Sequence, residues 1–113
     1  MKNVTVIQID PYDVTLYFIT SRKAYAKTRA KFLKGKINLK DCVGMSSHFN
    51  NGNVQLVGVF DGKPCTLAHE VAHMCFKVLE ACGIPTDHLT SEAFCYLMSS
   101  VVSKCWRIMS KEL

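Results

Sequence analysis

The sequence predicts an α+β fold, in which a small antiparallel sheet and one helix pack on two long C-terminal helices. Up to about residue 60, β-branched and apolar residues gather in short segments bounded by Pro, Asn and Gly, which is typical of strands. From residue 64 on, apolar residues recur at helical spacing through two long segments. The length of 113 residues is that of one domain, residues 1–113, with one modest core.

Strands are predicted from extended segments at two places in the first half of the chain. The segments VTVIQI (4–9) and VTLYFIT (14–20) are separated by a turn at which Pro11 fixes the backbone. They form either two strands or one strand bent at Pro11. Further along, MSSHF (45–49) and VQLVGVF (54–60) flank NNGN, and Asn-Gly between extended segments predicts a hairpin.

Three helices are expected. The first begins at Ser21 as N-cap, runs to about Lys34 and ends at Gly35. Pro64 suits the first turn of the second helix, which extends to about Cys82 before Gly83. The third begins at Thr90 or Ser91 and extends to about Lys111. The loop of about eight residues between the last two helices favours antiparallel packing.

Composition excludes several classes of protein. The chain is 49% hydrophobic and 20% charged, which is ordinary for a soluble globular protein. No segment approaches the roughly 18 apolar residues that span a bilayer, and the N-terminus lacks the apolar stretch of a signal peptide. We therefore expect a cytoplasmic protein with no membrane partner. We also expect its six cysteines to be reduced and buried, and the absence of a Cys-x-x-Cys pair argues against a cysteine zinc cluster.

The segment HEVAH contains the candidate chemistry. Residues four apart on a helix are only about 40° out of line, so His69 and His73 project from one face and can bind one zinc ion. Glu70 is offset by one residue, which places it beside the metal, where it can deprotonate a water molecule. A catalytic zinc site needs a third protein ligand, and Glu92 in TSEAFCYLM is the candidate on the next helix. The alternative is an apolar helix that carries two histidines without metal.

HEVAH, followed nineteen residues later by Glu92 in SEAF, resembles the gluzincin zinc peptidases, the thermolysin-like group. The resemblance covers residues 66–102 and implies a minimal zincin-like domain. It implies His69, His73 and Glu92 as ligands of Zn²⁺, and Glu70 as general base. It also implies that an edge strand, GMSSHF or NVQLVGVF, pairs with the backbone of a protein or peptide substrate.

One position departs from the family pattern. Tyr96 stands where members of this group often carry an aspartate that orients a zinc-bound histidine. We expect the Tyr96 hydroxyl to take that part or to stabilise an oxyanion. More loosely, the whole chain resembles small uncharacterised proteins of tailed bacteriophages, which would place it in the host cytoplasm.

Two functions are therefore predicted. The first is a zinc-dependent metallopeptidase in which Glu70 activates water for peptide-bond hydrolysis. The alternative is a zinc-stabilised phage protein that binds a host protein or nucleic acid without catalysis, through the basic segment 21–36. That segment carries much of the formal net charge of +5, although solvent-exposed basic helices are common on soluble domains.

Overall fold

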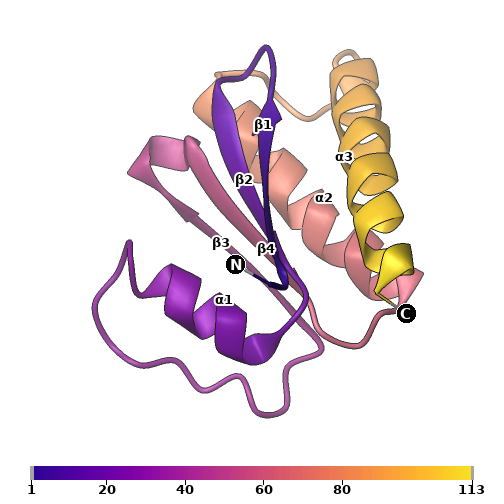
Figure 1. Cartoon of the computed structure of the whole chain (residues 1–113). Helices are drawn as coiled ribbons and strands as arrows, with labels where there is room; N and C mark the ends of the chain where they lie inside the picture. Colours follow the sequence, from indigo (N-terminus) through magenta and orange to yellow (C-terminus); the bar gives the residue numbers. More distant parts are fainter. Residues whose placement is uncertain (1, 113) are drawn as a thin grey trace.

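The computed structural model describes residues 2–112 and confirms an α+β fold (Figure 1). The strands are β1 (Val4–Ile9), β2 (Val14–Ile19), β3 (Gly44–Phe49) and β4 (Val54–Val59). The helices are α1 (Arg22–Arg29), α2 (Pro64–Ala81) and α3 (Ser91–Lys111), and a short 3₁₀ turn, Asn50–Gly52, joins β3 to β4.

The four strands form one mixed sheet in the order β1-β2-β4-β3. β1 and β2 pair in antiparallel fashion from Val4 opposite Ile19 to Ile9 opposite Val14, so the segments on either side of Pro11 are two strands. The predicted hairpin of β3 and β4 is confirmed, but β2 and β4 pair in parallel, and the prediction of a purely antiparallel sheet is wrong there. The reason is burial: all but the first residue of β4 are buried, so β4 takes an inner position and leaves β3 at the edge.

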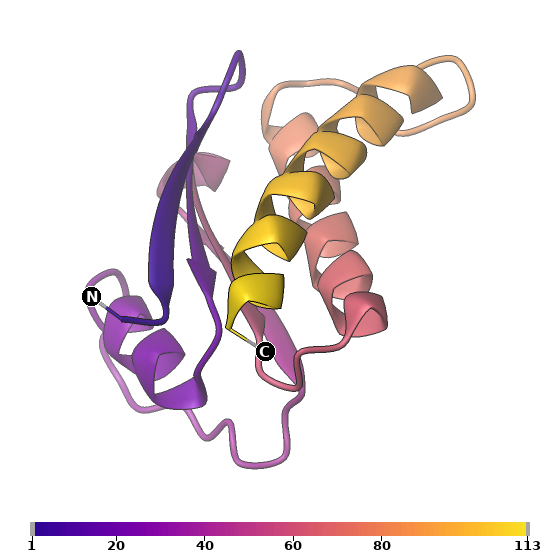
Figure 2. The ribbon, with the colours of Figure 1, turned by 45° about the vertical axis from the view of Figure 1, so that its right-hand side comes forward.

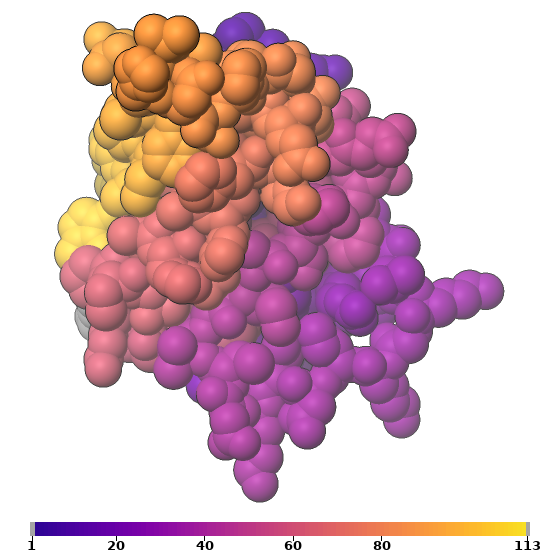
Figure 3. Space-filling view, turned by 180° about the vertical axis from the view of Figure 1, so that it is seen from behind, coloured from indigo at the N-terminus to yellow at the C-terminus, as the bar shows by residue number. Residues whose placement is uncertain are grey.

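The sheet separates two layers of helix. Figure 2 shows α1 on one side of the sheet and the pair α2 and α3 on the other. Viewed from behind, the surface of α2 lies directly beside that of the segment that contains β3 (Figure 3). α2 packs over β3 and β4, and α3 packs against α2.

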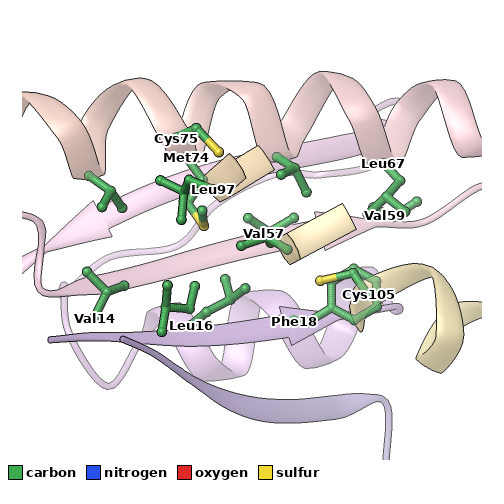
Figure 4. Close-up of a cluster of buried hydrophobic side chains, with 14 of the residues drawn as sticks. Val14, Leu16, Phe18, Val57, Val59, Leu67, Met74, Cys75, Leu97 and Cys105 are labelled. Carbon is green, nitrogen blue, oxygen red and sulfur yellow. The ribbon is translucent and has the colours of Figure 1, made fainter. Parts of the chain in front are cut away.

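Each face of the sheet has its own core cluster, because successive strand residues point to opposite faces. On one face, Leu16 and Phe18 of β2 and Val57 of β4 pack against α2 and α3 (Figure 4). On the other face, Ile19 and Leu56 pack against Tyr25 of α1. Both faces of the inner strands are therefore buried.

The predicted bounds of α2 and α3 are confirmed, whereas α1 is shorter than expected. α1 ends at Arg29 and continues as irregular turns, with the amide of Phe32 donating to the carbonyl of Arg29 at 2.9 Å. The ring of Phe32 stacks on Phe49 at a centroid distance of 5.4 Å and meets Tyr17 edge-on at 5.7 Å. This packing draws the chain off the helix axis before Gly35.

The cysteines agree only in part with expectation. All six are free, but only Cys75 and Cys105 are buried, and Cys65, Cys82 and Cys95 are exposed. The exposed three lie on the solvent side of α2 and α3, which periodicity alone did not separate from the core side. Between residues 2 and 112, no helix combines the length and the apolar character required to cross a membrane.

Candidate functional site

The start of α2 is fixed by the turn that precedes it. The Asp61 carboxylate accepts hydrogen bonds from the amide of Lys63 at 3.1 Å and from the hydroxyl of Thr66 at 2.7 Å. Desolvation alone would raise the pKa of Asp61, but these two bonds together bring that pKa below its usual value. An ionised carboxylate at this end also complements the helix dipole. The HEVAH segment thus begins in the second turn of a well-anchored helix.

The two histidines of the motif lie side by side on the exposed surface of α2. Their Nε2 atoms are 3.2 Å apart, and the rings are nearly perpendicular, with an interplanar angle of 77°. Two nitrogens bound to one tetrahedral zinc at 2.0–2.1 Å are about 3.3 Å apart. The separation between His69 and His73 therefore matches that of two ligands of one ion. It also suits an N–H···N hydrogen bond between two neutral imidazoles.

Glu70 points toward β3, away from the histidine pair, and its side chain is only 8% exposed. The hydroxyl of Ser46 lies 3.0 Å from Glu70 Oε1 and 2.9 Å from the Glu70 carbonyl oxygen, so its single proton is shared between two acceptors of one residue. A carboxylate that is nearly buried needs such a partner. Ser46 therefore fixes the orientation of Glu70 beside the histidines.

Close approach of β3 to α2 depends on small side chains. A Cβ added at Gly44 would lie 2.8 Å from Thr66 Cγ2 and 2.9 Å from Glu70 Cγ. Gly44 and Ser46 alternate along the strand, so both face α2. The absence of larger side chains at these two positions lets the strand lie directly under the carboxylate.

A groove of about 460 Å³ runs between β3 and α2 and brings the motif together with residues from the strand. Its lining includes His69, Glu70 and His73 from the helix and Ser46 and His48 from the strand. β3 is an edge strand, so half of its backbone N–H and C=O groups face away from β4. The groove thus combines imidazoles, a carboxylate and an open strand edge.

The other two predicted site residues lie elsewhere. Glu92 is exposed in the first turn of α3, and Tyr96 is 71% exposed one turn further. Neither residue lines the groove. Within residues 2–112, no three side chains of His, Cys, Asp or Glu lie close enough together to hold one metal ion.

The position of Glu92 follows from the antiparallel packing of the last two helices, which sets the start of α3 beside the second half of α2. Phe94 there contacts Phe76, with ring centroids 4.8 Å apart. The structure therefore brings His69, Glu70 and His73 together but not Glu92, whose role as third ligand stays a prediction, as does the role of Tyr96.

Sequence reasoning missed Ser46, Gly44 and the place of His48. A glycine and a serine at alternate positions of a strand are a signal for close backbone approach. That signal names no partner, because the contact with Glu70 spans 24 residues. His48 follows Ser46 by two residues and reaches the same groove for the same reason.

Comparison of the chain with protein-family models, with curated proteins and with solved structures found no match. Function is therefore argued from the residues of the groove and their geometry.

Proposed function

We propose that the chain is a zinc-dependent hydrolase of peptide bonds, with His69 and His73 as metal ligands and Glu70 as general base. The observation that supports this most is the 3.2 Å separation of the two Nε2 atoms, close to that of two ligands on one zinc. The nearly buried carboxylate beside them, held by Ser46, is the second support.

The donor set suits zinc, which takes imidazole and carboxylate ligands and keeps one position open in catalytic sites. Glu92 is our proposed third ligand, on the family resemblance. When bound, zinc would act as a Lewis acid on a carbonyl and would make water acidic enough to lose a proton near neutral pH. The remaining steps are assigned to residues of the chain.

Glu70 is assigned the proton transfer. Its Oε1 atom is engaged by Ser46, so Oε2 is the atom that takes a proton from the attacking water and passes it to the leaving amine. The Ser46 hydrogen bond keeps this carboxylate from rotating, and a fixed orientation is what makes a general base effective. Tyr96 is assigned a supporting role through its hydroxyl, as predicted from its position in the motif.

An extended peptide is the substrate that suits the groove. β3 offers an open backbone edge, so a peptide can add to it as a further strand through main-chain hydrogen bonds. Met45, Met74 and Phe76 add apolar surface along the same groove for side chains of the peptide. Recognition of this kind tolerates many sequences.

The test is the metal content of untagged protein purified without chelator, measured by mass spectrometry. We expect about one zinc per chain in the wild type, loss of zinc in His73→Ala, and weakened binding in Glu92→Ala. His88→Ala and Glu80→Ala are the matched controls, since each removes an exposed side chain of the same type, and both should keep the metal. Wild-type protein that stays free of zinc after supplementation would overturn the proposal.

Activity is tested separately with a library of unstructured peptides. Glu70→Gln should keep zinc and fold but lose cleavage, and full activity in that variant would show that the assigned base is wrong. Tyr96→Phe should keep zinc and lower turnover. Because the two histidines are exposed and lie outside both core clusters, a chelator should leave the fold intact. Unfolding by the chelator would favour the alternative, a zinc-stabilised binding protein.

A further inference from the structure

Positive charge is concentrated in one part of the chain. Eight of the fourteen Lys and Arg residues fall between positions 22 and 40, with no Asp or Glu among them. They are Arg22, Lys23, Lys27, Arg29, Lys31, Lys34, Lys36 and Lys40. The other six are interspersed with all nine acidic residues. We call the surface formed by the eight the basic face.

The basic face covers the layer of the molecule opposite α2 and α3. α1 and the segment after it lie on the far side of the sheet from the C-terminal helices (Figure 2). The apolar side of α1 is turned inward, with Ala24 and Tyr25 buried and the Tyr25 hydroxyl hydrogen-bonded to Ser47 at 2.5 Å. This anchoring turns Lys23 and Lys27 outward, and both are exposed.

Little of this charge is used inside the fold. Arg22 is the exception, because its Nε donates to the carbonyl of Cys42 at 2.9 Å and its guanidinium lies over the Phe60 ring. Within the described part of the chain the only ion pair joins Lys77 to Glu80, on α2. Seven cations are thus held close together without an acidic neighbour in an ion pair. Like charges gathered in this way repel one another, and an anionic partner would relieve that repulsion.

We infer that the basic face binds the phosphate backbone of nucleic acid. Six of the eight cations are lysines, which contact phosphates as point charges, whereas base reading relies on bidentate side chains. The side chains of this segment project outward from the surface, as Figure 3 shows for the magenta region. A backbone with a charge at every nucleotide suits cations spread over such a surface.

Two other polyanions suit the face less well. A helix that binds a membrane surface presents large apolar side chains outward between its cations, but between residues 22 and 40 only Leu33 is a large exposed apolar side chain. An acidic peptide is usually held by a groove or a strand edge that orders it. The groove of this protein is on the other side of the sheet, so its occupation by a peptide and the binding of nucleic acid are independent.

The test is fluorescence anisotropy with a labelled 20-base-pair DNA duplex and a single strand of equal length, at salt concentrations from 50 to 200 mM. Each phosphate neutralised in a duplex contributes about −0.9 to the slope of log K against log salt. Four contacts predict a slope of about −3.6, which is roughly a hundredfold loss of affinity over this range.

Two variants with the same change of charge separate the basic face from net charge alone. The first combines Lys23→Gln, Lys27→Gln, Lys31→Gln and Lys34→Gln. The control combines Lys63→Gln, Lys104→Gln, Arg107→Gln and Lys111→Gln, all exposed on the opposite layer. The first should bind at least tenfold more weakly with a slope near zero, and the control should stay within about threefold of the wild type. Circular dichroism checks that both are folded.

Three outcomes would overturn the inference. One is equal weakening in both variants, which would reduce the effect to net charge. Another is no binding of either nucleic acid at 50 mM salt. The third is tighter binding to polyglutamate or to anionic lipid vesicles than to DNA, which would assign the face to a different partner.

Discussion

The hydrogen bond from Ser46 to Glu70 links β3 to the proposed base, and its loss has a calculable effect. Ser46→Ala removes one hydroxyl that serves Glu70 Oε1 at 3.0 Å and the Glu70 carbonyl at 2.9 Å. A hydrogen bond to a charged group contributes about 1.5–3 kcal/mol, and this proton is shared between two acceptors. We therefore expect the free energy of unfolding to fall by about 1–2 kcal/mol.

A double-mutant cycle isolates the part that depends on the charge. Glu70→Gln keeps an oxygen acceptor but makes it neutral, and a neutral hydrogen bond contributes only about 0.5–1.5 kcal/mol. Ser46→Ala and Glu70→Gln should therefore be coupled by about 1 kcal/mol. The measurement is urea unfolding of metal-free protein, followed by the fluorescence of Trp106, the single tryptophan. Metal-free protein is used so that zinc does not contribute to stability.

The control is Ser47→Ala, which removes a hydroxyl from the opposite face of the same strand, where it bonds to Tyr25. That variant should lose stability too, yet its effect should add to that of Glu70→Gln within about 0.3–0.5 kcal/mol. If the Ser46 cycle shows no more coupling than the Ser47 cycle, Glu70 is not held by the strand. The account of a pre-oriented base would then be wrong.

Two further predictions concern stability. Gly44→Ala places a methyl group 2.9 Å from Glu70 Cγ, so we expect it to lower the free energy of unfolding by about 1–3 kcal/mol, and an unchanged urea midpoint would contradict the close packing of β3 on α2. Burial raises the pKa of Tyr25, Cys75 and Cys105 to about 12. The folded state holds these protons longer than the unfolded state, so stability is at its full value below about pH 9 and falls as pH rises toward 12. Urea titrations at a series of pH values test this, and a free energy of unfolding that is constant up to pH 11 would contradict it.

Local signals predicted the helical half of the molecule well. Pro64 and Gly83 delimit α2 by backbone chemistry that acts within a turn, and the observed helix ends within a residue of the expected place. The proximity of His69 and His73 is local in the same sense, because residues four apart on any helix are neighbours. Both features were therefore accessible from the sequence.

Contacts between distant segments were not accessible in this way. The parallel pairing of β2 with β4 depends on which strand is buried on both faces, and the shortening of α1 depends on where Phe32 finds its aromatic partners. The location of Glu92 depends on how two helices pack, which periodicity does not set. The partner of Glu70 came from a serine in a strand that the sequence marks only as small and polar.

The edge position of β3 has a mechanical consequence for the proposed enzyme. The strand whose free edge would receive a peptide is the same strand whose hydroxyl holds the carboxylate. A peptide that pairs with β3 would stiffen it, and the stiffening would reach Glu70 through one hydrogen bond and through the contact at Gly44. Substrate occupancy and alignment of the base would then be two effects of a single ordering event, and a short peptide that fails to span the strand would be cleaved slowly even when it binds.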